Sequence, residues 1–360
     1  MEKALFFKAL FAFVISFALI KILKPISIKV GLVDKPNERK QHDNEIPLVG
    51  GLGIYLAVLA VGLIFVADTS MLYAYYSGAG LLTVVGVIDD RINLSVKIRI
   101  MATFIATGIM IYYNNVLFIN LGNLLGFGDI RLPFYLAVPF TMIATFGIVN
   151  AMNMMDGIDG LSSSLTIVTL AALLVVLDFH TRLKLLIIVL IAALLAFQIF
   201  NLELSRRVKK VFMGDAGSMM VGFTLIMFIC FLSQSTALRG PRFEPVTGLF
   251  FVGLPLIDMV STVLRRIKKG KSPFHPDRTH AHHILMHAGF SPRQTLVILI
   301  ALSALINSMG LLLEYLITPA WLQFIVFLLL FVFYFQGIQH SFKLSHFLQK
   351  VHGQRISSSS

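Results

Sequence analysis

The side chains of this sequence that are best placed to do chemistry are aspartates in short polar motifs beside apolar stretches. Asp89 and Asp90 are adjacent in VIDDRINLSVKIR, and Lys97 and Arg99 follow within ten residues. Near a membrane interface, desolvation and mutual repulsion would raise the pKa of at least one carboxyl group toward that of a general base. Two adjacent residues of a helix point in different directions, so the pair is expected to play two different parts. The alternative is a helix terminus that carries ordinary charges.

Two further motifs place carboxylates beside glycines. Asn153, Asp156 and Asp159 recur at a spacing of three in NAMNMMDGIDGL. A helix would align them on one face, whereas the intervening glycines favour a turn in which the backbone approaches a ligand. Asp215 stands between glycines in KKVFMGDAGSMMVGF, where a carboxylate beside a helix N-terminus suits a divalent cation and a phosphate together. The structural alternatives are a polar loop for the first motif and a helix N-cap for the second.

The fourth motif is the basic, histidine-rich segment 265–294. It contains Arg278, His280, His282 and His283. The short gaps between these histidines do not match a four-ligand zinc site, and no thiol is nearby. Cations mixed with histidines better suit a diphosphate and a sugar. The alternative here is a solvated basic loop.

The composition places these motifs in a polytopic membrane protein. Of the 360 residues, 57% are hydrophobic and only 13% are charged, and the mean hydropathy is +0.84. A soluble domain averages about 25% charged residues. The net charge of +12 fits basic loops beside membrane helices and does not indicate nucleic acid as a partner. The single cysteine, Cys230, cannot form an internal disulfide.

Eleven stretches are apolar enough to span a bilayer, which predicts an all-α fold. They are 4–23, 46–66, 71–88, 98–115, 132–150, 161–177, 185–201, 217–233, 245–264, 294–313 and 319–338. The first lacks a small-residue cleavage site and is therefore expected to be retained. We expect one transmembrane domain over 1–345 and a tail over 346–360, disordered at its end.

The distribution of Lys and Arg predicts the orientation. One set of alternate loops, together with the C-terminal tail, holds 22 basic residues, and the opposite set holds 6. By the positive-inside rule the first set is cytoplasmic, with the N-terminus outside and the C-terminus inside. Seven aspartates, namely Asp34, Asp89, Asp90, Asp156, Asp159, Asp215 and Asp277, fall in or beside the cytoplasmic loops, as do the histidines His275, His280, His282, His283 and His287. One face of the protein is therefore predicted to be the active face.

Together the motifs favour Mg²⁺-dependent phosphoryl chemistry on a phosphorylated lipid at a membrane surface. A transporter is one alternative, and it should carry ionisable residues near mid-membrane. Asp258 is the main candidate for such a residue. A CDP-alcohol phosphotransferase is another, but its DGxxAR signature is replaced here by DGIDGL. A purely structural protein would not need seven aspartates on one face.

The order of the motifs makes the chain resemble the polyprenyl-phosphate N-acetylhexosamine-1-phosphate transferases over nearly its whole length. It is most similar to the branch that transfers GlcNAc-1-phosphate from UDP-GlcNAc to undecaprenyl phosphate at the bacterial inner membrane. The motifs are VGLVDKPNERKQH, IPLVGG, DDRINLSVKIR, NAMNMMDGIDGL, KVFMGDAGS, PLIDM and KGKSPFHPDRTHAHHILMHAGFSPRQ. The related phospho-MurNAc-pentapeptide transferases carry a different histidine-rich stretch, so their substrate is less expected. Another UDP-N-acetylhexosamine donor stays open.

The resemblance also implies roles for single residues. Asp89 and Asp90 match the catalytic DD motif, and Asp215 matches a metal-binding aspartate, with Asn153 near metal and diphosphate. Mg²⁺, or Mn²⁺ in its place, is the implied cofactor. The expected substrate-binding residues are Lys97, Asn153, Asp156, Asp159, Arg278, His280, His282 and His283. One aspartate of the pair would deprotonate or orient the lipid phosphate, although a covalent aspartyl-phosphate route is an alternative. A homodimer is a possible assembly.

Overall fold

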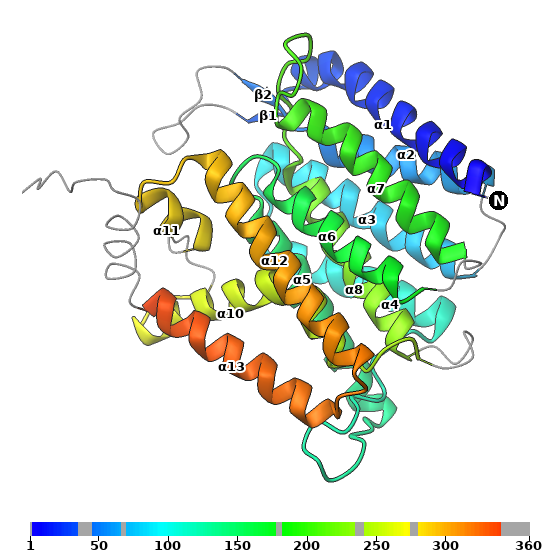
Figure 1. The fold of residues 1–360 in the computed structure, drawn as a ribbon. Coiled ribbons are helices and arrows are strands. Elements are labelled where there is room, and N and C mark those ends of the chain that lie inside the picture. The colour runs from blue at the N-terminus through cyan, green and yellow to red at the C-terminus, as the bar shows by residue number, and fades with distance from the viewer. Residues whose placement is uncertain are drawn as a thin grey trace, which may run out of the picture.

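The fold is helical apart from one pair of two-residue strands and an isolated bridge (Figure 1). The computed structural model describes residues 2–34, 45–65, 70–177, 182–234, 241–273 and 280–339, so the tail 346–360 lies outside the described residues. The helices are α1 (Glu2–Val30), α2 (Gly50–Phe65), α3 (Ser70–Ile92), α4 (Val96–Asn114), α5 (Phe134–Met155), α6 (Leu161–Val175), α7 (Arg182–Asn201), α8 (Gly214–Gln234), α9 (Thr247–Phe251), α10 (Gly253–Lys268), α11 (Ala281–His287), α12 (Pro292–Tyr315) and α13 (Ala320–Gln339). Strands β1 (Val33–Asp34) and β2 (Ile46–Pro47) pair antiparallel. The predicted all-α fold is confirmed.

Each of the eleven predicted spans falls on a helix, but they are not eleven equal helices. Within the described residues, eight helices are long and apolar enough to cross a membrane, namely α1, α3, α4, α5, α7, α8, α12 and α13. Helices α2 and α6 are apolar but shorter. The stretch predicted as a single span at 245–264 is divided at Val252 into α9 and α10. Pro255 explains the division, because its ring clashes with the carbonyl four residues earlier, at the last residue of α9.

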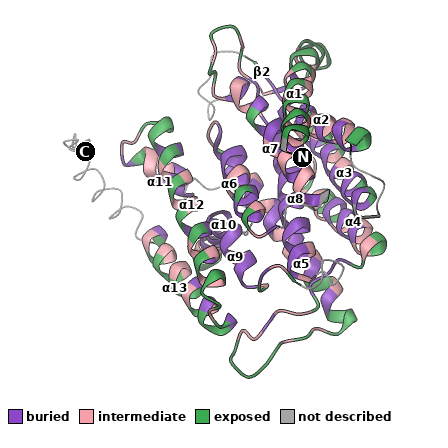
Figure 2. Cartoon of the chain, turned by 45° about the vertical axis from the view of Figure 1, so that its right-hand side comes forward, coloured by how far each residue is buried: buried purple, intermediate pink, exposed green. Residues whose placement is uncertain are grey.

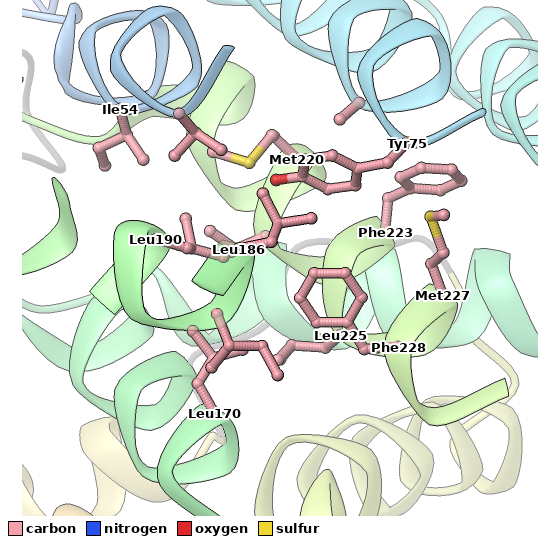
Figure 3. Close-up of a cluster of buried hydrophobic side chains, with 14 of the residues drawn as sticks. Ile54, Tyr75, Leu170, Leu186, Leu190, Met220, Phe223, Leu225, Met227 and Phe228 are labelled. Atoms are coloured by element: carbon pink, nitrogen blue, oxygen red, sulfur yellow. The ribbon is translucent and has the colours of Figure 1, made fainter. Parts of the chain in front are cut away.

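Helix α8 lies at the centre of the bundle. Of an 18-residue stretch of α8, 94% is buried, against 17% for α13 at the edge (Figure 2). Helices α2, α3, α5 and α6 all pack on α8. The apolar cluster around α8 contains Ile54, Tyr75, Leu170, Leu186, Leu190, Met220, Phe223, Leu225, Met227 and Phe228 (Figure 3). A helix that is apolar on all sides is expected at such a position.

Glycines bring the ends of α2 and α3 into backbone contact with the start of α8. A Cβ on Gly86 of α3 would lie 2.3 Å from Cα of Ala216, and one on Gly51 of α2 would lie 2.1 Å from N of Gly217. Side chains at these two positions would therefore push the helices apart. The close approach places the C-terminal end of α3 against the N-terminal end of α8.

The IPLVGG motif fastens the chain segment that leads into α8. The backbone N–H of Phe212 donates to the carbonyl of Pro47 at 2.9 Å. In return, the N–H groups of Gly50 and Gly51 donate to the carbonyls of Phe212 and Met213, each at 3.0 Å. These hydrogen bonds extend the β1–β2 pair and fix the position of the residues that precede α8.

A second apolar cluster joins α10, α12 and α13 beside the central bundle. It includes Phe250 of α9, Ile257 of α10, Leu299 of α12 and Phe327 of α13, together with Ala281 at the start of α11. In Figure 1, α11 and the β1–β2 pair both lie toward the upper left, on the other side of the bundle from the label N. Because Ala281 belongs to this second cluster, the cluster attaches α11 to α10, α12 and α13.

Candidate active site

The carboxylate of Asp90 caps the N-terminus of α8 from outside that helix. Oδ1 accepts a hydrogen bond from N–H of Asp215 at 2.8 Å, and Oδ2 accepts one from N–H of Ala216 at 3.3 Å. The first N–H groups of a helix have no partner within it and carry partial positive charge, so they stabilise an anion there. Gly214 makes the contact possible, because its φ is +72° and a Cβ would lie 2.4 Å from Oδ2 of Asp90.

Asp89 points into the protein and makes a different set of contacts. Only 4% of it is exposed. Oδ1 accepts a hydrogen bond from N–H of Leu94 at 2.6 Å, and Oδ2 lies 3.3 Å from Nη1 of Arg99. The two adjacent aspartates thus diverge, as the helical geometry predicts. Asp89 fixes the turn between α3 and α4, while Asp90 fixes α8.

Asp215 and Asn153 complete a cluster at the ends of α3, α5 and α8. The amide nitrogen of Asn153 donates to Oδ1 of Asp215 at 2.5 Å and to Oγ of Ser218 at 3.0 Å. The carboxyl groups of Asp89 and Asp215 are close enough for their negative charges to repel each other. When both are charged they are acceptors only, so this pair needs a proton or a cation between its oxygens. Asp215 lies within the first turn of α8, and Asp90 takes the capping role.

The segment after α5 forms a turn, and not a continuation of the helix. Helix α5 ends at Met155, so Asp156 and Asp159 lie in the loop that leads to α6. Part of the Asp156 residue is exposed, but its carboxyl group is surrounded by protein. The protein around it, the charge of Asp215 and the charge of Asp159 raise the pKa of Asp156 to about 7. Nζ of Lys210 pairs with Oδ2 of Asp159 at 2.5 Å.

Asn201 ties this loop to the segment that leads into α8. Its Oδ1 accepts a hydrogen bond from N–H of Gly160 at 2.5 Å, and its Nδ2 donates to the carbonyl of Val211 at 2.9 Å. Gly160 adopts a φ of +75°, which an L side chain rarely takes. Asn201 is buried, so both bonds are protected from water. The aspartate loop, defined as residues 156–160, is therefore held in place relative to Asp215.

Helix α11 covers the aspartate loop with a histidine. His282 is 1% exposed, and a Cβ on Gly157 would lie 2.3 Å from its Nε2. Within the described residues, neither ring nitrogen of His282 has a hydrogen-bond partner. Desolvation and the neighbouring rings of His283 and His280 lower the pKa of His282 to about 3. The ring is therefore neutral at physiological pH, and the glycine leaves room for it to touch the loop.

The sequence comparisons identify the family. Residues 72–233, which include the cluster from Asp89 to Asp215, match glycosyl transferase family 4. An undecaprenyl-phosphate alpha-N-acetylglucosaminyl 1-phosphate transferase of Escherichia coli O157:H7 is 39% identical over 335 residues, or 91% of this chain and 89% of the relative. The chain belongs to glycosyl transferase family 4. Relatives with the same name are 37% identical in Yersinia pestis, covering 95% of this chain and 93% of the relative, and 35% identical in Haemophilus influenzae, covering 93% and 94%.

In this member of glycosyl transferase family 4, the structure gathers most of the predicted site residues at one end of the bundle. The cluster, the aspartate loop and the α11 histidines are joined by the contacts described above. Lys97 is exposed, and Arg99 is the cation that pairs with Asp89. Arg278 lies outside the described residues.

Four residues of the site were not predicted. They are Lys210, Ser218, Asn201 and Asp258. Lys210 counted only as one of the basic loop residues, and Ser218 was the last letter of GDAGS without a role. Asn201 ends an apolar helix and gave no signal. Asp258 was considered only under the transporter alternative, and the structure makes it the partner of His280, with its Oδ2 2.6 Å from Nδ1 of the imidazole.

The oxygen donors of the cluster suit a hard cation only in part. No group of three or more His, Cys, Asp or Glu side chains in the described ranges converges into a site that would hold a metal by itself. Asp89 and Asp215 offer carboxylate oxygens, and a half-turn of the Asn153 amide would present Oδ1 in place of Nδ2. Six-coordinate Mg²⁺ is commonly held by one or two carboxylates plus water and substrate phosphates. The donor set fits that pattern and requires a substrate to complete it.

Proposed function

We propose that this protein transfers GlcNAc-1-phosphate from UDP-GlcNAc to undecaprenyl phosphate, giving undecaprenyl-diphospho-GlcNAc and UMP. This would be the first membrane step in making a lipid-linked surface glycan. The observation that supports it most strongly is the meeting of separate motifs in one cluster at the ends of α3, α5 and α8. The relatives that carry this activity in their names align with about nine-tenths of the chain.

The reaction exchanges one phosphoanhydride for another. An oxygen of the lipid phosphate attacks the β-phosphorus of the donor, a new P–O bond forms, and the bond from that phosphorus to the oxygen of UMP breaks. Because the bond that forms resembles the bond that breaks, the protein needs to supply positioning and charge neutralisation. The three carboxylates are held in place for that task. Asp89 pairs with Arg99 of α4, Asp90 accepts a hydrogen bond from the start of α8, and Asp215 accepts one from Asn153 of α5.

We propose Mg²⁺ as the cofactor, with Mn²⁺ as a substitute, held by Asp215 and Asn153. The ion supplies positive charge that neutralises the diphosphate. The support is electrostatic: Asp89, Asp90 and Asp215 bring three carboxyl groups together, and Arg99 is the cation that pairs with one of them. Phosphate oxygens would add further negative charge, so a divalent cation would be needed for the substrate to bind.

Asp90 is the better candidate for the residue that orients or deprotonates the lipid phosphate. It is partly exposed, whereas Asp89 is 4% exposed and pairs with Arg99. The N–H groups of Asp215 and Ala216 hold the Asp90 carboxylate in one orientation. A fixed acceptor that a substrate can reach without rearrangement suits proton abstraction. Asp89 would act by holding the turn after α3.

The donor nucleotide is proposed to lie over the aspartate loop, between Asp156, Asp159 and the α11 histidines. Lys210 pairs with Asp159 and would bring positive charge to the phosphates. His282 is buried against Gly157 with two ring nitrogens that have no partner in the described structure, so it has hydrogen-bonding capacity left for a sugar. Another UDP-N-acetylhexosamine would use the same contacts, and direct competition between donors distinguishes the two.

We also propose that this end of the bundle faces the cytoplasm in the bacterial inner membrane, because the loops on this side hold 22 of the basic residues. Cysteine accessibility tests the orientation. With Cys230 replaced by alanine, a single cysteine at Ser205 should be labelled by an impermeant maleimide only after cells are opened. Labelling in intact cells would contradict the proposed orientation.

The proposed reaction is tested by incubating the purified protein with UDP-GlcNAc, undecaprenyl phosphate and Mg²⁺ and following UMP. We expect UMP release that requires both substrates and stops in EDTA. UDP release in place of UMP would overturn the proposed function, as would the absence of any product in a preparation that still binds UDP-GlcNAc.

A further inference from the structure

A buried carboxylate joins three helices behind the α11 histidines. Asp258 of α10 is completely buried. Its Oδ2 lies 2.6 Å from Nδ1 of His280, and its Oδ1 accepts from N–H of Ala281 at 2.9 Å and from the hydroxyl of Tyr334 at 2.5 Å. A buried charge is costly unless it is paired and hydrogen-bonded. Here α10, α11 and α13 all contribute to satisfying it.

The contacts of Asp258 determine which ring nitrogen of His280 carries a proton. Oδ1 of Asp258 already accepts two hydrogen bonds, so the carboxylate is the acceptor and Nδ1 of His280 carries a proton. The hydroxyl of Thr262 lies 3.5 Å from the same nitrogen. A carboxylate bound to one imidazole nitrogen sets both the ring orientation and the role of the other nitrogen. Nε2 is thus the nitrogen of His280 that the network leaves for other contacts.

The same carboxylate fixes the start of α11. His280 is the N-cap residue of this helix, with φ −70° and ψ 155°, and Ala281 is its first residue. Asp258 binds the side chain of the former and the backbone N–H of the latter. Two bonds to consecutive residues allow the helix little rotation about its own axis.

The ring of His280 is connected to the aspartate loop through the ring of His282. Its plane is 2° from that of His282, with ring centroids 5.8 Å apart. His282 in turn lies against Gly157, where an added Cβ would be 2.3 Å from Nε2. The ring centroid of His283 is 4.2 Å from that of His282. A shift at Asp258 would therefore move the surface that faces Asp156 and Asp159.

We propose that Asp258 and Tyr334 are positioning residues for donor binding. They orient His280 and the start of α11 and so place His282 over the aspartate loop, without contacting the substrate themselves. The inference rests on the proposed function, because it assigns the loop to UDP-GlcNAc. Helix packing alone does not require this network, since apolar side chains of similar volume often replace buried ion pairs without loss of stability. The directional bonds to His280 and Ala281 are what an apolar replacement would not supply.

Tyr334→Phe is the sharpest test, because it removes one hydroxyl and keeps the ring. We expect the KM for UDP-GlcNAc to rise about tenfold, the effect of losing one hydrogen bond to a charged group. The KM for undecaprenyl phosphate should stay close to that of the wild type. The melting temperature should fall slightly, because Asp258 loses one of its three bonds and keeps those to His280 and Ala281. Tyr315→Phe makes the same chemical change at a position that is 82% exposed and should alter none of these values.

Asp258→Asn tests the direction of the bonds. The amide keeps the shape of the carboxylate but presents a donor in place of one acceptor. If the amide nitrogen faces His280, the ring proton must move from Nδ1 to Nε2. We expect a larger rise in the KM for UDP-GlcNAc than Tyr334→Phe gives. If this variant does not fold, Tyr334→Phe still decides the question.

Histidine reactivity gives a readout that does not depend on turnover. Diethyl pyrocarbonate, followed by peptide mass mapping, measures the modification rates of His280 and His282, with exposed His287 as the internal reference. We expect both buried histidines to react several-fold faster in Tyr334→Phe than in the wild type. Unchanged reactivity together with an unchanged KM for UDP-GlcNAc would overturn the proposal. If the wild type does not use UDP-GlcNAc at all, the proposed function fails, while the reactivities still report on positioning.

Discussion

Asp90 and Asp215 are 125 residues apart in the sequence, yet Oδ1 of Asp90 accepts a hydrogen bond from the backbone N–H of Asp215 at 2.8 Å. The end of α3 is thereby attached to the start of α8. Gly86 and Gly214 allow the approach, since a side chain at either would meet α8 or the Asp90 carboxylate. The DD and GDAGS motifs consequently form one structural unit, and a change in either should be felt by both.

Both aspartates of the DD pair should lose activity when changed to asparagine, but for different reasons. Asp90→Asn loses the carboxylate that a lipid phosphate would reach, so its rate should fall by at least about two orders of magnitude. It also turns a donor toward the start of α8, which should cost about 1 kcal/mol of stability. Asp89→Asn should lose a similar factor in rate because Arg99 loses its partner. UDP-GlcNAc binding, measured by calorimetry, should largely survive in both. A loss of binding equal to the loss of rate would make the pair a substrate clamp.

Asp215→Asn should abolish turnover and remove the dependence of nucleotide binding on Mg²⁺. The reason is that Asp215 offers the carboxylate between Asn153 and Asp89, where a cation would be shared with the diphosphate. Titration of UDP binding at several Mg²⁺ concentrations measures the effect. Ser218→Ala is the matched control, because it removes the second bond of Asn153 and the 3.4 Å bond to the Asp215 carbonyl oxygen but leaves the Asp215 carboxylate, so it should retain the Mg²⁺ dependence. Near-normal activity of Asp215→Asn at low Mg²⁺ would show that this residue serves α8 alone.

Gly214→Ala should destabilise the protein and inactivate it. The position has a φ of +72°, which costs a non-glycine residue roughly 1–2 kcal/mol, and the added Cβ would collide with Oδ2 of Asp90. Gly108→Ala in α4 is the control, since a Cβ there meets nothing within 4 Å and alanine favours a helix. Melting temperatures and UMP release are the measurements. An active, stable Gly214→Ala protein would mean that Asp90 does not need its contact with α8.

The pH dependence of stability should change in Asp156→Asn. The pKa of Asp156 is about 7 in the folded state, above the ordinary value of 3.8, so the folded state holds this proton more tightly. The contribution of Asp156 to stability is therefore complete below the ordinary pKa and is lost as the pH rises toward 7. Relative to the asparagine variant, the wild type should lose melting temperature between pH 5 and pH 7 and then level off. Parallel pH profiles for the two proteins would contradict the raised pKa.

The apolar stretches were sufficient to predict where the helices lie, because a long apolar segment has few other stable states in a membrane. They did not predict the division at Val252, where the proline signal was hidden within an otherwise continuous run. The break between α4 and α5 was predicted by the gap between the spans 98–115 and 132–150 and is confirmed by the bounds of the two helices. Helix boundaries could therefore be predicted where polar residues interrupt the apolar sequence, but not where the sequence stays apolar.

The site was predictable as a set of residues but not as a set of contacts. Aspartates in an apolar chain stand out, so Asp89, Asp90 and Asp215 were found from sequence. That Asp90 caps α8 while Asp89 holds Arg99 depends on how helices pack, which no local pattern encodes. The role of Asp258 was not predicted for the same reason, because its partners His280 and Tyr334 lie 22 and 76 residues away in sequence.

The fate of the β-phosphorus tests the central claim most directly. The purified protein is given undecaprenyl phosphate and UDP-GlcNAc labelled with ³²P at the β-phosphorus only, and the lipid and nucleotide products are separated. We predict that all transferred label is found in the lipid diphosphate and that the released nucleotide is unlabelled UMP. Label recovered in free UDP, with an unlabelled glycolipid, would show transfer of the sugar alone and would contradict GlcNAc-1-phosphate transfer.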